Sequence, residues 1–182
     1  MIHLKNSGHV PKDAKKLLVQ ADKLVAGMHA IVRDMRVSSR YLEFDISISK
    51  EYLDILVKKL GTIGPLDNAR HIVEEEMQKE EAVEKGREYF NDERFWECHE
   101  TLEGVWKKSH NEEKDLVQGI ILVAAAFVHY QKNEDEICLS ILRRAIEKIG
   151  NASGKYHKID VDVLRNKVLE IIHSGTIKTF TI

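Results

Sequence analysis

The chain contains only two cysteines, Cys98 and Cys138, which are far apart in the 182 residues and form no Cys-x-x-Cys pair. A disulfide framework is therefore not expected, and the two thiols are typical of the reducing cytoplasm. No apolar run approaches the roughly 18 residues that suggest a membrane span. The first ten residues also lack the basic and apolar segments of a secretory signal. These absences predict a cytoplasmic protein without a membrane partner.

The chain also lacks an excess of either charge. Lys and Arg total 28 against 30 for Asp and Glu, so the formal net charge is only -2. A polyanion is held chiefly by a basic surface, so we expect no nucleic-acid partner. Hydrophobic residues make up 43% of the chain, which is enough for a globular core. The length leaves room for one large domain or two small ones.

The N-terminal part shows the two-residue period of β-strands. Two alternating apolar and polar runs surround Ser38-Ser39, which is a predicted turn, and an amphipathic helix is expected on each side of this hairpin. The expected elements are, in order, a strand over residues 1–6, a helix over 12–28, strands over 31–37 and 42–48, a helix over 50–60 and a strand over 62–73. This order is typical of a ferredoxin-like βαββαβ domain, which we assign to residues 1–75.

The use of this N-terminal domain stays open between self-association, docking on the rest of the chain and ligand sensing, because the fold alone implies no activity. An open sheet edge favours pairing between copies, so we expect a homo-oligomer and favour a dimer.

Residues 76–182 show helical spacing almost throughout. Four predicted helices cover residues 93–109, 112–131, 135–149 and 160–173, and another runs through the charged segment before Asn91. We therefore expect an all-α bundle of about five helices in this second domain, which makes the fold class α+β.

The segment FWECHETLEGVW, residues 95–106, places polar groups among aromatic ones. At about 100° per residue, His99 and Glu103 share one helix face with the two tryptophans, while Glu97 and Glu100 lie toward its flanks. His99 and Glu103 are four residues apart and so are neighbours. We expect both to point into the bundle.

The following helix is apolar nearly all round, with Gln118, Leu122, Ala125 and His129 along one stripe. Buried polar groups are costly unless they satisfy one another. Gln118 and His129 are therefore expected to face His99 and Glu103.

The segments YFNDERFWECHETLEGVWKKS and LVQGIILVAAAFVHYQKNEDEICLSIL resemble the signature of the domain of unknown function 309 family over about residues 85–149. Cys98 stands where that family usually has alanine, and Gly104 where it often has glutamate. The resemblance implies an all-helical domain and supplies no reaction, and residues 1–75 lie outside it. The matching positions are Asn91, Glu97, His99, Glu100, Glu103, Trp106, Gln118, Gly119 and His129.

This polar cluster has three interpretations: a structural network, a small-molecule or catalytic pocket, and a metal site. A catalytic site would use His99, Glu100 and Glu103, because neighbouring carboxylates raise the pKa of one of them and create a proton donor. A metal could be bound by the same residues and His129. No second His/Glu motif of a di-iron bundle is present, so we predict no metal and no cofactor. The predicted ligand-binding residues are Glu97, Trp106, Gln118 and His129.

No phosphate-cradling glycine loop, dinucleotide fingerprint or nucleophile elbow is present. We therefore expect a two-domain small-molecule-binding or regulatory protein with a polar pocket in the helical bundle. The alternatives are an acid–base or metal-assisted hydrolase that uses the same cluster, and a purely structural assembly scaffold. Whether the protein is an enzyme stays open.

Overall fold

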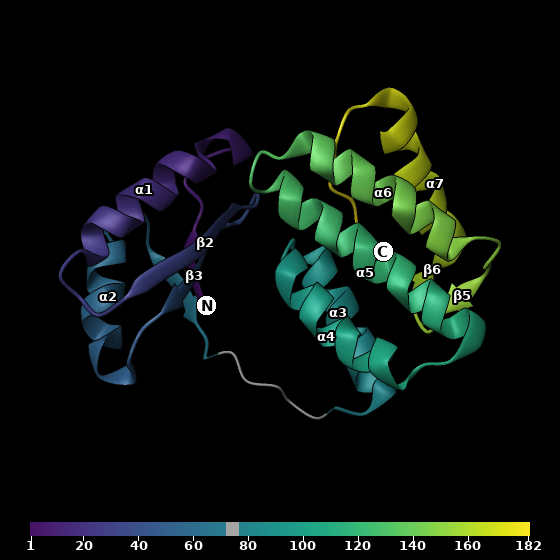
Figure 1. Ribbon diagram of the computed structural model, residues 1–182, viewed down its shortest axis with the longest axis horizontal. Helices are drawn as coiled ribbons and strands as arrows, with labels where there is room; N and C mark the ends of the chain where they lie inside the picture. The colour runs from purple at the N-terminus through teal and green to yellow at the C-terminus, as the bar shows by residue number, and fades with distance from the viewer. Residues whose placement is uncertain (72–76) are drawn as a thin grey trace. The chain divides into compact units, whose positions relative to one another are not determined.

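The computed structural model describes residues 1–71 and 77–182 (Figure 1). The fold is mixed α+β, with strands first and then mostly helices. Two compact units are formed, one by Met1–Glu74 with Gln131–Asn133 and one by Glu75–Tyr130 with Glu134–Ile182. The predicted boundary between residues 75 and 76 lies outside the described residues, as does the acidic start of the first predicted bundle helix. None of the helices in the described ranges is long and apolar enough to cross a membrane.

The N-terminal unit is a four-stranded sheet with two helices. The order of strands across the sheet is β2-β3-β1-β4, and each neighbouring pair is antiparallel. The hairpin turn falls at Ser38-Ser39, where the pattern predicts it. The elements are β1 (Ile2–Lys5), the 3-10 turn η1 (Pro11–Asp13), α1 (Ala14–Val25), β2 (Ile31–Val37), β3 (Tyr41–Ser47), the 3-10 turn η2 (Lys50–Tyr52), α2 (Leu53–Leu60) and β4 (Leu66–Ala69).

The two faces of this sheet carry different chemistry. Alternate residues such as Leu4 and Phe44 are fully buried in one apolar core with Leu17 of α1 and Leu56 of α2. Intervening residues point to the opposite face, because successive side chains of a strand alternate. On that face the register places His3 opposite Glu43, and Glu43 opposite Arg36, in one row across three strands. The unit therefore has an apolar side under its helices and a row of buried polar groups on the other side.

The second unit contains the helices α3 (Lys79–Asn91), α4 (Phe95–Lys108), α5 (Asn111–Tyr130), α6 (Asp135–Ile149) and α7 (Val161–Ser174). The sequence pattern indicated no strand between residues 76 and 182. The structure differs before α7, where β5 (Lys155–Tyr156) and β6 (Ile159–Asp160) pair antiparallel. Asp160 caps α7 by accepting a hydrogen bond from the backbone N–H of Val163 at 3.0 Å.

Glycines set how closely the helices approach one another. A Cβ added at Gly119 of α5 would lie 2.6 Å from a side-chain carbon of Ile149 and 3.0 Å from its backbone nitrogen. A Cβ at Gly86 of α3 would lie 2.8 Å from Leu102 of α4. Larger residues at these two positions would force the helices apart, so the bundle needs glycine there.

The segment after α7 returns to the start of the helical unit. The Phe180 ring packs against Phe90 and Phe127, with centroids 5.6 and 5.5 Å away. The side chain of Asn91 forms two hydrogen bonds with the backbone of Ile182: it accepts from the N–H at 2.7 Å and donates to the carbonyl at 3.0 Å. Asn91 therefore anchors this segment, and it does not cap α4, which begins after Arg94.

Candidate functional site

Helix α4 carries most of the predicted site residues, but its buried face differs from the expected one. Phe95, Cys98, Leu102 and Val105 are buried and define the packing face. His99 lies beside this face and is only half-buried. The expectation that His99 and Glu103 point into the bundle is wrong. The reason is that the face with Cys98, Leu102 and Val105 is fully buried in the core, whereas Trp106 is only partly buried against it.

The structure does bring the three predicted catalytic residues together. Nδ1 of His99 lies 3.1 Å from a carboxylate oxygen of Glu100, and Nε2 lies 3.7 Å from one of Glu103. The side chains of the two glutamates are 47% and 41% exposed. The imidazole ring is thus bracketed by two carboxylates on an open helix surface.

This bracketing does not gather ligand atoms around one point, because the carboxylates contact different nitrogens of His99. Among the described residues of the helical unit, no three His, Cys, Asp or Glu side chains bring ligand atoms within 4.8 Å of one another. A proton can be passed between ring and carboxylate in this geometry, which is the chemistry the cluster offers.

The predicted ligand-binding residue Glu97 is buried, with 3% of its surface exposed. Arg94, one turn earlier, donates to both oxygens of its carboxylate at 2.6 and 2.5 Å. Both oxygens therefore take part in a bidentate ion pair at the start of α4, and the ligand-binding role of Glu97 stays a hypothesis.

The stripe of α5 is formed as expected, but it is the least buried side of that helix. Gln118, Leu122, Ala125 and His129 are all half-buried. Nδ1 of His129 lies 2.5 Å from Glu134, which precedes α6. Within the described residues no hydrogen bond or ion pair joins Gln118 or His129 to the cluster on α4, so the predicted facing pairs are not formed.

Trp106 combines a stacked cation with a buried polar atom. The ammonium of Lys114 lies 4.5 Å from the centre of the indole ring. The indole N–H is buried and has no hydrogen-bond partner in the described part of the chain. The predicted ligand-binding role of Trp106 thus stays a hypothesis, and its ring face is occupied by Lys114.

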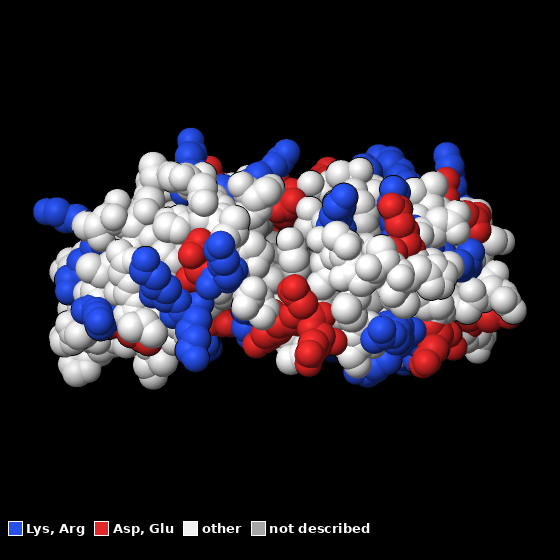
Figure 2. All heavy atoms as spheres, turned by 90° about the horizontal axis from the view of Figure 1, so that it is seen from above, with Lys and Arg blue, Asp and Glu red and all other residues white. Residues whose placement is uncertain are grey.

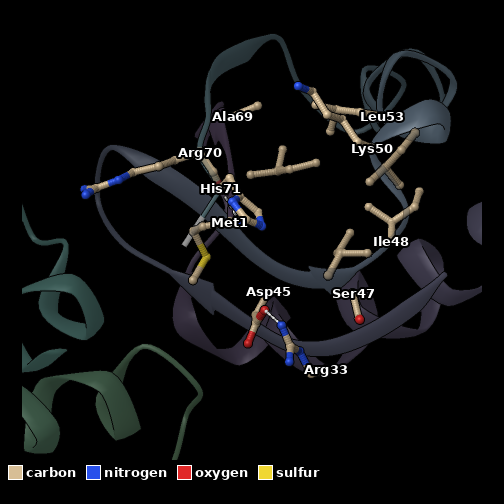
Figure 3. A pocket seen from close by; sticks show the side chains of 13 residues that line it. Met1, Arg33, Asp45, Ser47, Ile48, Lys50, Leu53, Ala69, Arg70 and His71 are labelled. Atoms are coloured by element: carbon tan, nitrogen blue, oxygen red, sulfur yellow. Dashed lines mark hydrogen bonds and ion pairs between the residues drawn. The ribbon is translucent and has the colours of Figure 1, made fainter. Parts of the chain in front are cut away.

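A pocket of about 490 Å³ lies in the N-terminal unit (Figure 3). Because neighbouring strands are antiparallel, the first residues of β1 and β2 lie beside the last residues of β3 and β4. The pocket is located at this end of the strands. The segment from β3 into α2 closes another side. The lining residues are Met1, Ile2, Arg33, Asp45, Ile46, Ser47, Ile48, Lys50, Leu53, Leu56, Ala69, Arg70 and His71.

The pocket has an apolar wall and a polar rim. Ile2, Ile46 and Leu56 are buried, with 3%, 8% and 0% of their surface exposed. On the rim, Arg33 donates to the Asp45 carboxylate at 2.9 Å, and Figure 3 shows this pair along one side of the opening. Such a combination of apolar surface and few polar groups is typical of small-molecule sites.

Sequence reasoning identified none of these pocket residues. Strand alternation predicts that Asp45 lies off the apolar core face, but it places Arg33 on the same face as Met35, because the irregular register between Val32 and Asp34 is not visible in the sequence. The meeting of β4 with the segment before α2 depends on tertiary structure, so Ala69 and Lys50 could not be brought together from the sequence.

The family model described as "Domain of unknown function (DUF309)" matches residues 83–141. This range covers α4, α5 and parts of α3 and α6, which are all helical. The resemblance predicted from the sequence is therefore confirmed for the helical region, and the N-terminal unit lies outside the match. No curated protein sequence matches the chain.

Proposed function

We propose that this chain is a small-molecule-binding protein with a regulatory role, and that its ligand binds in the pocket of the N-terminal unit. The observation that carries the proposal is the pocket itself. Its volume of about 490 Å³ lies within the range of roughly 300 to 1,000 Å³ that is usual for ligand sites. The cluster on α4 is a weaker ligand site, because Glu100 and Glu103 are largely open to solvent.

We further propose that the pocket belongs to a ferredoxin-like domain. The helices are proposed to form a five-helix bundle, part of which resembles a family of unknown function. The element order and the antiparallel β2-β3-β1-β4 sheet support the first assignment. Cys98 and Cys138 are both free and buried, which supports a cytoplasmic location.

Two variants of strand β4 test the location of the ligand site. Ala69 lines the pocket, whereas Asn68 precedes it and points to the opposite face of the strand. Ala69→Trp would fill the pocket, and Asn68→Trp would add the same bulk outside it. Both residues are exposed, so both variants are expected to fold.

The measurement is a metabolite screen for a raised Tm, because a ligand that prefers the native state stabilises it. We expect stabilising compounds to act on the wild type and on Asn68→Trp and to lose their effect on Ala69→Trp. Compounds that stabilise Ala69→Trp as strongly as the wild type would exclude the pocket as their site.

A second candidate function is acid–base hydrolysis at the α4 cluster. It is favoured by one observation, the contact of both His99 nitrogens with carboxylates at 3.1 and 3.7 Å. Turnover of nitrophenyl ester and phosphoester probes would test it. We expect His99→Ala to abolish such turnover and the exposed His110→Ala to preserve it. Equal rates in the two variants would remove this candidate.

A further inference from the structure

The charged groups around the N-terminal pocket are mostly cationic. Asp45 is the one carboxylate among the lining residues, and Arg33 already pairs with it at 2.9 Å. Lys50 is exposed and makes no ion pair within the described residues. His71 is likewise exposed and lies on another side of the opening. Apart from the ion pair of Arg33 with Asp45, the rim carries the positive charge of Lys50.

Figure 3 shows how these basic side chains are arranged. The Arg70 side chain extends away from the cavity, whereas Lys50 and His71 border it on two sides. The Ser47 hydroxyl belongs to the same lining. An ammonium, an imidazole and a hydroxyl can each donate a hydrogen bond to an anionic group.

The wall below this rim is apolar. Ile2, Ile46 and Leu56 are buried, and Ile48 and Leu53 are half-buried beside them. These five residues have no charged group that could pair with a polar ligand, so this wall favours binding of the apolar part of a ligand. A ligand that satisfies the whole pocket therefore has an apolar body and an anionic head.

We propose that the pocket selects an amphipathic anion, that is, a small molecule with a carboxylate or phosphate group on an apolar chain, with Lys50 as the principal contact of the anionic group. This inference rests on the proposed function and names the ligand class of the same site. The charge on the surface of the N-terminal unit supports an anionic ligand. Figure 2 shows Lys and Arg side chains gathered on the drawn face of this unit, at the left of the view. Such a surface attracts anions.

A matched set of six-carbon probes tests the head group. Hexanoate, hexyl phosphate, hexanol and hexylamine each contain one unbranched chain of six carbons, the carboxylate carbon included, and differ in the charge of the head group. We expect the two anions to bind at least tenfold more tightly than hexanol in isothermal titration calorimetry, and hexylamine to bind most weakly. Butanoate is expected to bind roughly tenfold more weakly than hexanoate, because it has two fewer methylenes to bury. The tighter of the two anions identifies the source as a carboxylate or a phosphate.

Two lysine variants locate the contact. Lys50→Gln removes the rim charge, and Lys16→Gln removes an exposed charge on α1 of the same unit, so both change the net charge equally. We expect Lys50→Gln to weaken anion binding roughly fivefold or more and to leave hexanol unchanged. Lys16→Gln is expected to bind all four probes as the wild type does.

The results separate this inference from the function on which it rests. Hexanol binding as tightly as hexanoate, or anion binding unaffected by Lys50→Gln, would overturn the anion class while the pocket remains a ligand site. If none of the four probes binds but Ala69→Trp still abolishes stabilisation by metabolites, the anion class is also overturned and the pocket remains a ligand site. Hits that Ala69→Trp does not block would overturn both.

Discussion

The side-chain Nε of Arg36 donates to a carboxylate oxygen of Glu43 at 2.5 Å, and both side chains are buried on one face of the neighbouring strands β2 and β3. Nε2 of His3 lies 3.3 Å from the other oxygen of the same carboxylate. Burial alone would raise the pKa of Glu43, but the Arg36 guanidinium and the His3 ring lower it to about 2. The folded state therefore holds Glu43 as an anion.

The first prediction concerns the loss of this anion. Glu43→Gln removes the buried counter-charge of Arg36 and leaves only the half-buried carboxylate of Asp34, which lies 3.0 Å from the guanidinium, so we expect the free energy of unfolding at neutral pH to fall by about 3 kcal/mol. The double variant Arg36→Met with Glu43→Leu removes both charges and is expected to be near the wild type in stability. Urea denaturation of the three proteins measures the difference. A double variant as unstable as Glu43→Gln would contradict this account.

The same pair predicts a pH dependence. Glu43 has a pKa of about 2 in the folded protein and about 4.3 when unfolded, so its contribution to stability is present above pH 4.3 and is lost as the pH falls toward 2. The stability gap between the wild type and Glu43→Gln should therefore narrow between pH 5 and pH 2. Denaturation curves across this range would show it, and a constant gap would mean that Glu43 is not the anion responsible.

The third prediction uses two glycines in neighbouring helices. Gly119→Ala would place a methyl group against the backbone of Ile149, whereas a methyl group at Gly104 would meet nothing within 4 Å. We expect Gly119→Ala to lower stability by about 1 to 3 kcal/mol, because the close packing of α5 and α6 must be disturbed. Gly104→Ala is the matched control and is expected to raise stability by up to about 1 kcal/mol through its helix propensity. Thermal unfolding that ranks the two variants the other way would refute the packing argument.

Local patterns in the sequence were sufficient to predict the elements of the N-terminal unit. Leu42, Phe44 and Ile46 alternate with polar residues because one face of β3 covers the core, and this period is visible without coordinates. The orientation of α4 was harder to predict. Trp106 is a large apolar residue that suggests a central core position, yet it is only partly buried against the core, and Cys98 and Leu102 are the fully buried residues. Which of several apolar stripes is buried depends on the shape of the neighbouring helices, and the sequence of α4 does not contain that information.

The fourth prediction concerns the segment after α7. Asn91→Ala removes both hydrogen bonds to the Ile182 backbone, and Phe180→Ala removes a ring from the aromatic cluster with Phe90 and Phe127. We expect losses of about 1 to 2 kcal/mol for Asn91→Ala and about 2 to 3 kcal/mol for Phe180→Ala. Amide hydrogen exchange should become faster at Ile182 in both variants. The exposed neighbour Thr181 provides the control, since Thr181→Ala should change neither property.

The last prediction separates a functional α4 cluster from a purely structural one. Glu103 lies 3.7 Å from His99 and 3.8 Å from Lys107, and its side chain is 41% exposed. Ion pairs of this kind contribute little to stability, so Glu103→Gln should change the free energy of unfolding by no more than about 0.5 kcal/mol. Glu147→Gln, at an exposed position of α6, is the control for the loss of one negative charge. If Glu103→Gln keeps its stability but loses probe turnover or a cellular function that Glu147→Gln retains, the carboxylate acts in a site. If it retains the function and loses more than about 1.5 kcal/mol, the cluster serves the structural network, because only a network residue would carry that much stability at so open a position.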